Sequence, residues 1–339
     1  MAPALWRTIL VSLVLSVAGI LAVLLWLGDP SDLRALGRLS LPAVAGSLLL
    51  LAASFLAGGT RLAVLVAMAG DRVNAWRATR AFVLGLFGAA ITPSGGGNGP
   101  AIALSLIRDG VRSSVAWSIT VYGSISDLLF FAWAIPASAL VLHLTGHLAD
   151  ARLLWLAFGL SAASLLLWYL LAFELARATR LGGRIFSLAG LRRWRRPAMR
   201  TLAGIGAATA TVTRSHIGWH VLLQLLTIGL HLLLYSIFFL LARALGADLN
   251  FLVSQAVLLL VSATSYLVPT PGASGYLELA LSYSFSSQLS AGVLAASVLT
   301  YRALSYYAAV LLGGILGGAV LSKELIKRTP RDDLPGRVP

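Results

Sequence analysis

The stretch ITPSGGGNGPAIALSLI, residues 91–107, interrupts an otherwise apolar chain with two prolines and four glycines. A similar stretch, LVPTPGASGYLELALSY, covers residues 267–283. Proline lacks a backbone donor and glycine is costly to order, so both residue types disfavour a continuous helix. Each stretch therefore predicts two short helices joined by a tip.

The chain around these interruptions has the composition of an integral membrane protein. Its 339 residues are 58% hydrophobic and 11% charged, with a mean hydropathy of +0.88, whereas soluble domains contain about 25% charged residues. Apolar runs of roughly 20 residues cross a hydrocarbon layer about 30 Å thick as helices. We therefore expect an all-α polytopic membrane protein. Because the chain has no cysteine, disulfides and thiol chemistry are excluded.

The apolar segments give a topology of six full spans and two re-entrant helical hairpins. The spans are predicted at residues 5–27, 41–68, 113–142, 151–173, 217–243 and 290–320. The interrupted segments, 81–110 and 250–288, are the predicted hairpins, since each half is short for a complete crossing. Two tilted, kinked spans are the alternative interpretation.

The predicted elements repeat once along the chain. Residues 1–150 contain two spans, a hairpin and a third span, and residues 151–322 contain the same order, followed by a tail at 323–339. Because the first half crosses the membrane an odd number of times, the second half enters upside down. The sequence therefore predicts an inverted-topology repeat, with one hairpin entering from each side of the membrane.

The distribution of basic residues orients this topology. With a cytoplasmic N-terminus, 20 of the 26 basic residues lie inside, 4 lie outside and 2 fall within spans. The loop at 174–216 and the tail supply most of the inner charge. The positive-inside rule thus favours cytoplasmic termini in a multi-pass protein of the cell (cytoplasmic) membrane. We attribute the net charge of +14 to this topology and expect no nucleic-acid partner.

Interruptions at matching places in two inverted halves indicate a substrate site near the membrane midplane. Thr92-Pro93 and Thr270-Pro271 are repeat mates, 178 residues apart. A half-helix that starts inside the membrane directs free N–H groups and its positive dipole end toward the tip, which favours an anion. Glycine turns that only let helices pack are the alternative. The candidate substrate-binding residues at the tips are Thr92, Pro93, Gly95, Gly96, Gly97, Asn98, Pro269, Thr270, Pro271, Gly272, Ser274, Gly275 and Glu278.

Ionisable residues deep in apolar segments are candidates for function by default. Asp127 and Arg302 complete the candidate set, because they occupy similar depths in the third and sixth spans. They either form an ion pair or divide roles, with Arg302 holding a phosphate. Glu278 is placed to cap the second half-helix, with proton coupling or substrate contact as the alternative. Arg61 is expected to extend toward the cytoplasmic surface.

The sequence offers little for a metal, a cofactor or a hydrolase. The pairs His143/His147 and His216/His220 have a helical metal-ligand spacing, but no cysteine or clustered carboxylate completes either site. His231 is expected to be a hydrogen-bonded interior residue. We therefore expect no metal, no cofactor and no enzymatic activity.

The motifs ITPSGGGNGPAIALSLIRDGV, VPTPGASGYLEL and LLTYRALSYYAAVLLGG give the chain a family resemblance. It resembles the flippase-like, lysylphosphatidylglycerol synthase transmembrane region family, related to the flippase domain of the multiple peptide resistance factors. In those relatives this region moves an aminoacylated phosphatidylglycerol between leaflets, and a separate soluble domain makes the lipid. Members often have Gln where Asn98 stands here. Since only a short polar tail follows the last span, synthase activity is not expected.

The resemblance and the paired tips together predict a lipid translocase. Its expected substrate is an anionic or phosphate-bearing membrane lipid, such as an aminoacyl-phospholipid or a polyprenyl-linked glycan lipid. One alternative is a non-transporting membrane partner that presents lipid to a glycosyltransferase or lipid synthase. A second alternative is an intramembrane enzyme.

Overall fold

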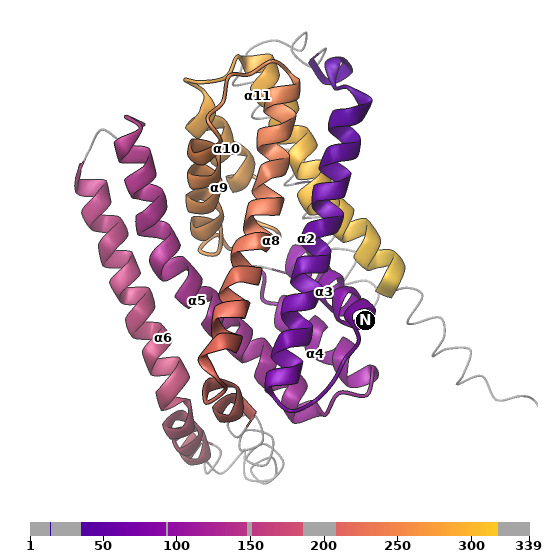
Figure 1. The fold of residues 1–339 in the computed structure, drawn as a ribbon, viewed down its shortest axis with the longest axis vertical. Helices are drawn as coiled ribbons and strands as arrows, with labels where there is room; N and C mark the ends of the chain where they lie inside the picture. The colour runs from indigo at the N-terminus through magenta and orange to yellow at the C-terminus, as the bar shows by residue number, and fades with distance from the viewer. Residues whose placement is uncertain (1–13, 15–34, 93, 148–150, 186–207, 318–339) are drawn as a thin grey trace, which may run out of the picture.

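The computed structural model describes residues 14, 35–92, 94–147, 151–185 and 208–317 (Figure 1). All regular secondary structure in these ranges is helical, which confirms the all-α class. Within these ranges, four helices are long and apolar enough to cross a membrane, as expected for a multi-pass membrane protein. They are α2 (Leu41–Met68), α5 (Ser113–Leu144), α8 (Ile217–Ala244) and a helix over Ala291–Gly317 that contains α11 (Ala291–Arg302) and the π-helical segment η3 (Ala303–Tyr307). The tail at 323–339 and the predicted first span at 5–27, except for residue 14, lie outside the described ranges.

Both predicted interruptions separate two short helices. The first pair is α3 (Ala75–Ala90) and α4 (Asn98–Arg108), and the second pair is α9 (Phe251–Ser265) and α10 (Tyr276–Phe285). We call these pairs hairpin 1 and hairpin 2. The breaks therefore lie where proline and glycine predict them.

Two helix boundaries differ from the hydropathy pattern for local reasons. Helix α3 begins at Ala75 rather than at residue 81, because the Asn74 side chain caps it by accepting the Arg77 backbone N–H at 2.8 Å. Helix α6 (Ala151–Ile185) continues past the predicted span end at residue 173. Its sequence there is rich in alanine, leucine and arginine, which favour helix without requiring lipid. Part of the predicted loop at 174–216 is therefore helical.

The described helices recur in the same order with similar lengths. Helices α2, α3, α4 and α5 have 28, 16, 11 and 32 residues, and α8, α9, α10 and the Ala291–Gly317 helix have 28, 15, 10 and 27. The starts of corresponding helices are 176 residues apart for the first two pairs and 178 for the other two. Figure 1 shows α3 and α4 in the lower half of the molecule and α9 and α10 in the upper half.

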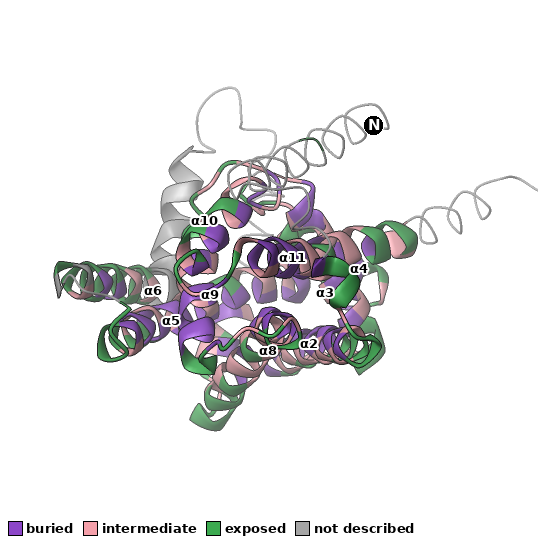
Figure 2. Cartoon of the chain, turned by 90° about the horizontal axis from the view of Figure 1, so that it is seen from above, coloured by how far each residue is buried: buried purple, intermediate pink, exposed green. Residues whose placement is uncertain are grey.

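The core lies between the long helices and the two hairpins. In the half that contains hairpin 2, Phe238 of α8 stacks on Phe285 of α10 with their ring centroids 4.8 Å apart, and both side chains are fully buried. Helix α6 packs along α5 at the edge of the molecule, and Figure 2 shows it largely exposed. Its exposed side chains include Leu156 and Leu166, as expected for a helix that faces lipid.

Ion pairs hold the open end of hairpin 1. Arg80 of α3 pairs with Asp109 at the end of α4, and Arg112 pairs with Asp71 in the turn after α2 at 3.2 Å. The backbone N–H of Arg112, together with that of Arg72, holds the pKa of the Asp71 carboxyl below its ordinary value. The α2–α3 and α4–α5 turns are therefore joined at this end.

Candidate functional site

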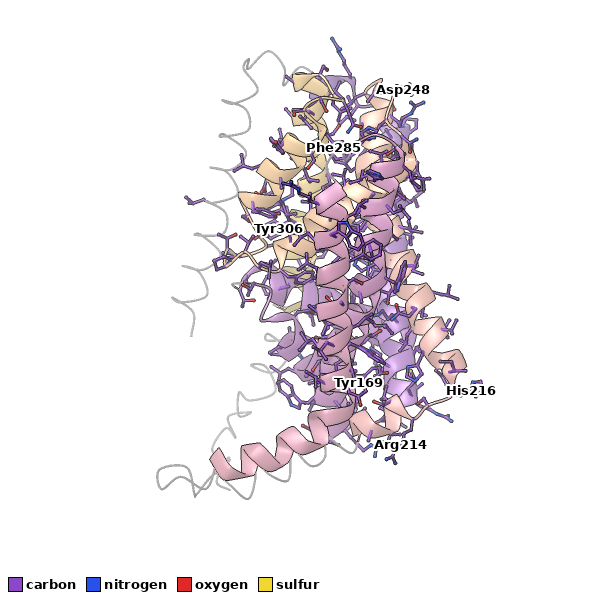
Figure 3. The ribbon with its side chains drawn as sticks, turned by 90° about the vertical axis from the view of Figure 1, so that its left-hand side faces the viewer. Tyr169, Arg214, His216, Asp248, Phe285 and Tyr306 are labelled. Carbon is purple, nitrogen blue, oxygen red and sulfur yellow. The ribbon has the colours of Figure 1, made fainter. Side chains whose placement is uncertain are left out.

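The tips of the two hairpins touch each other, as the sequence predicts. Ser94 Oγ of the first tip donates to the Val268 carbonyl of the second at 3.3 Å. Tyr306 of η3 donates its hydroxyl to the Ala90 carbonyl at the end of α3, 3.1 Å away. Figure 3 shows Tyr306 at mid-height, between Asp248 near one end of the molecule and Arg214 near the other. The contact therefore lies far from both ends.

The first tip is an internally hydrogen-bonded turn. Thr92 Oγ1 accepts the Gly97 backbone N–H at 2.7 Å and donates to the Gly88 carbonyl at 2.7 Å. A Cβ on Gly97 would lie 2.4 Å from the Gly88 carbonyl oxygen, so Gly97 allows α3 and α4 to approach closely. Gly95 adopts φ +69° in the turn. Close helix packing accounts for glycine at residue 97, and the positive φ accounts for glycine at residue 95.

The remaining candidates of the first tip are more open. Gly96 and Asn98 are exposed, and Pro93 lies outside the described residues. The Asn98 backbone N–H donates to the Gly95 carbonyl at 3.0 Å, and its side-chain oxygen lies beside Gly85 of α3.

The second tip is closed by its own backbone and by Glu278. Thr270 Oγ1 donates to the Ser274 carbonyl at 3.1 Å, and the Ser274 N–H donates to the Pro271 carbonyl at 3.2 Å. Glu278 Oε2 accepts the Gly275 N–H at 2.8 Å, which is the predicted cap of α10. A carboxylate of the protein thus occupies the positive end of this half-helix. Pro269 precedes the turn and is exposed.

Glu278 and Arg302 form a buried ion pair beside this tip. Arg302 Nε donates to Glu278 Oε1 at 2.8 Å, and the two residues are 3% and 0% exposed. Arg302 Nη2 also donates to the Gly272 carbonyl at 3.3 Å, and the guanidinium lies 4.7 Å from the centre of the Tyr306 ring. Arg302 is the last residue of α11, directly before the π-helical segment. Such segments often occur at functional sites.

Two small cavities lie near the tips, and Arg302 lines one of them. The first, about 200 Å³, lies between the tips, and we call it the tip cavity. The second, about 210 Å³, contains Arg302 in its wall and is called the aromatic cavity. Ser265, Tyr266 and Ser305 line both cavities, so a shared wall separates them. The further lining used below is Ser94, Gly95, Gly272 and Tyr306 for the tip cavity, and His231, Tyr235 and Tyr301 for the aromatic cavity.

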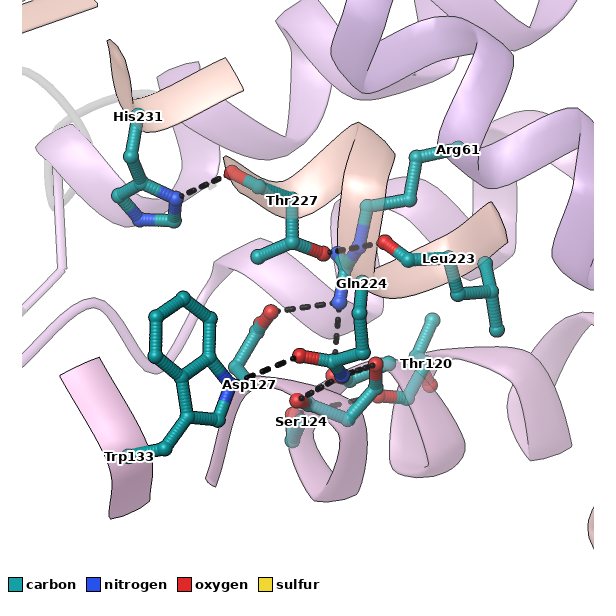
Figure 4. Close-up of polar contacts among 11 residues, drawn as sticks. Arg61, Thr120, Ser124, Asp127, Trp133, Leu223, Gln224, Thr227 and His231 are labelled. Carbon is teal, nitrogen blue, oxygen red and sulfur yellow. Dashed lines mark hydrogen bonds and ion pairs between the residues drawn. The ribbon is translucent and has the colours of Figure 1, made fainter. Parts of the chain in front are cut away.

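Asp127 has a different partner from the one the sequence suggested. Arg61 Nη2 of α2 donates to Asp127 Oδ1 at 2.5 Å and to the Gly123 carbonyl of α5 at 3.1 Å (Figure 4). Of the two alternatives for Asp127 and Arg302, the ion pair between them is therefore wrong, because Arg302 pairs with Glu278. The expectation that Arg61 extends to the surface is also wrong, since its side chain is 11% exposed and bonded to α5.

Sequence reasoning missed the polar contribution of α8. Gln224 Nε2 donates to the Ser126 carbonyl and lies 3.2 Å from Ser126 Oγ, next to Asp127 on α5. A glutamine in the apolar run VLLQLL is the signal that points to it. His231 Nδ1 donates to the Thr227 carbonyl at 2.8 Å, so His231 is the hydrogen-bonded interior residue that was predicted.

The site and the helices around it fall within one family match. The family model described as lysylphosphatidylglycerol synthase TM region matches residues 9–313. This range includes both tips and the Glu278–Arg302 and Arg61–Asp127 ion pairs. No curated protein matches the chain.

Proposed function

The chain belongs to the lysylphosphatidylglycerol synthase transmembrane-region family, and from this premise we propose that it is a lipid translocase. Its substrate in this proposal is an anionic or phosphate-bearing lipid, such as an aminoacyl-phospholipid or a polyprenyl-linked glycan lipid. The protein moves this lipid across the cytoplasmic membrane without altering it chemically. No cofactor is part of the proposal.

One observation carries the proposal: two broken helices meet tip to tip beside a buried ion pair. Ser94 and Val268 join the tips, and Glu278 and Arg302 lie next to the second tip. The matching helix order and lengths support an inverted repeat, with hairpins that re-enter from opposite sides. Broken helices at an inverted-repeat interface are the usual site of substrate binding in secondary transporters.

The size and polarity of the interior suit a headgroup rather than a whole lipid. Each cavity has a volume of about 200 Å³, and both contain hydroxyl groups. A charged headgroup loses its hydration in hydrocarbon, so a path through the membrane must replace water with polar groups. The tips, Arg302 and the tyrosines provide such groups, while the acyl chains remain in the surrounding lipid.

A leaflet assay tests the proposal. The protein is reconstituted into vesicles that contain a trace of fluorescent phosphatidylglycerol, and a membrane-impermeant quencher reports the fraction in the outer leaflet. We expect protein-dependent exchange of the labelled lipid between leaflets. Vesicles that exchange lipid no faster than protein-free vesicles would contradict the proposal. Exchange that requires an added glycosyltransferase or synthase would favour the presenting partner, and a changed lipid product would favour an enzyme.

Arg302→Lys gives a sharper version of this assay. A guanidinium donates in two directions to Glu278 and Gly272, whereas a lysine ammonium is a point charge without this planar fork. We expect at least tenfold slower exchange with the protein still folded. Arg243→Lys is the matched control, because Arg243 pairs with an exposed aspartate at the surface.

A further inference from the structure

The Glu278–Arg302 pair has no net charge, although an anionic lipid must be bound beside it under the proposed function. Both side chains are almost fully buried, so their charges are balanced in a medium of low polarity. The other deep ion pair, Arg61–Asp127, is likewise balanced. The charge of an incoming phosphate is therefore not neutralised by either pair as it stands.

Arg302 retains N–H groups for a ligand although it is bonded to Glu278. A guanidinium carries five N–H groups, and two of them are used in the described structure, by Glu278 and by the Gly272 carbonyl. Arg302 forms part of the wall of the aromatic cavity, whereas Glu278 is 0% exposed and does not line it. A phosphate oxygen in this cavity can therefore bind the same guanidinium that Glu278 now holds.

We propose, building on the lipid function above, that each phosphate headgroup binds at Arg302 together with one proton, which Glu278 takes up. A carboxylate and a phosphate on one buried guanidinium leave an unbalanced negative charge, which is costly away from water. Protonation of Glu278 removes this charge. The protein then carries the anion and the proton together, and a pH difference across the membrane drives lipid movement.

The proton transfer balances without any other reactant. A proton from water converts the Glu278 carboxylate to a carboxylic acid, whose Oε1 still accepts the Arg302 Nε–H. The phosphate oxygens accept from the Arg302 N–H groups that neither Glu278 nor Gly272 uses. The Gly275 N–H keeps a carboxyl oxygen as its acceptor. The acid O–H requires a new acceptor, and Ser282, one turn further along α10, has a fully buried hydroxyl with no hydrogen bond in the described structure. Release of the lipid reverses each step.

Glu278 is the carboxylate best placed for this role among the titratable groups nearby. Asp127 is the other deep carboxylate, and it is bonded to Arg61 on α2. Within the part of the chain that the structure describes, the titratable groups around the pair are Tyr301 on α11, Tyr306 on η3, Tyr266 after α9, Tyr235 and His231 on α8, and Tyr276 on α10.

Proton uptake on lipid binding is the direct test. Purified protein in weakly buffered detergent is titrated with short-chain phosphatidylglycerol while a pH indicator reports protons taken from solution. We expect about one proton per bound lipid, and an apparent Kd that rises about tenfold per pH unit where uptake is complete, as linkage of one proton requires. Glu278→Gln should bind lipid without uptake and without this pH dependence. Asp248→Asn, at an exposed surface position, should behave as wild type.

Two further arms keep the test decisive. Inorganic phosphate should cause no uptake, because a free ion lacks the acyl chains that anchor the headgroup beside the cavity. The double variant Glu278→Gln with Arg302→Gln removes both charges together and provides a folded protein if the single change is not tolerated. It too should show no uptake.

Several outcomes would overturn the inference. These are lipid binding without proton uptake, uptake that persists in Glu278→Gln or in the double variant, uptake with inorganic phosphate alone, and no binding of phosphatidylglycerol. Because the leaflet assay measures lipid movement independently, exchange without proton linkage would leave the proposed translocase intact and reject only the coupling.

Discussion

Gly272 is held in a place where no other residue fits. Its φ of +58° is in the region that favours glycine, and an added Cβ would lie 2.0 Å from Cε2 of the Tyr306 ring. We expect Gly272→Ala to destabilise the protein, since the strained backbone alone costs about 1–3 kcal/mol and the displaced ring adds to this. The melting temperature measured in detergent should fall by several degrees. Gly229→Ala on α8, where a Cβ meets nothing within 4 Å, is the control and should not lower it.

Asp127 and Arg61 should depend on each other for stability. Asp127→Leu leaves the Arg61 guanidinium without its carboxylate at a site where its side chain is 11% exposed. Breaking a fully buried pair costs about 3–5 kcal/mol, and we expect less here because the Asp127 side chain is 37% exposed. Adding Arg61→Leu should recover much of the lost stability, whereas adding Arg302→Leu should lower it further. Equal recovery with either second change, measured by thermal unfolding, would contradict the observed pairing.

The hairpins should move relative to each other if the lipid passes between their tips. Because the chain has no native cysteine, cysteines at Ser94 and Val268 can be joined by a short bifunctional reagent across the tip contact. We expect rapid cross-linking and loss of leaflet exchange, with recovery when the linker is cleaved. A pair at Ser94 and Asp248 should not react, since Asp248 lies near one end of the molecule (Figure 3). Full exchange in the cross-linked protein would contradict movement at the tips.

Helix positions could be predicted well because their causes are local. Helix α2 begins and ends where the apolar run does, with Pro42 in its first turn and Gly70 at φ +76° after its end. The Glu278 cap follows from its spacing to Gly275. Ion-pair partners depend on which helices cross and how far each side chain reaches. Repeat symmetry placed Asp127 opposite Arg302, but the contact of α5 with α2 brings Arg61 to it instead.

The orientation of the protein in the membrane follows from its charge distribution and is open to a labelling test. Figure 3 shows Arg214 and His216 near one end and Asp248 near the other, so the turns beside them should lie on opposite sides. With 20 basic residues on the side of Arg214 in the predicted topology, the positive-inside rule makes that side cytoplasmic.

In intact cells a membrane-impermeant thiol reagent should label a cysteine at Asp248 and should not label one at Ser215. A cysteine at Ser187, outside the described residues, should also be spared. All three should react once the membrane is permeabilised. If the cysteines at Ser215 and Ser187 were labelled in intact cells and the cysteine at Asp248 were protected, the predicted orientation would be wrong. Each hairpin would then enter the membrane from the opposite side.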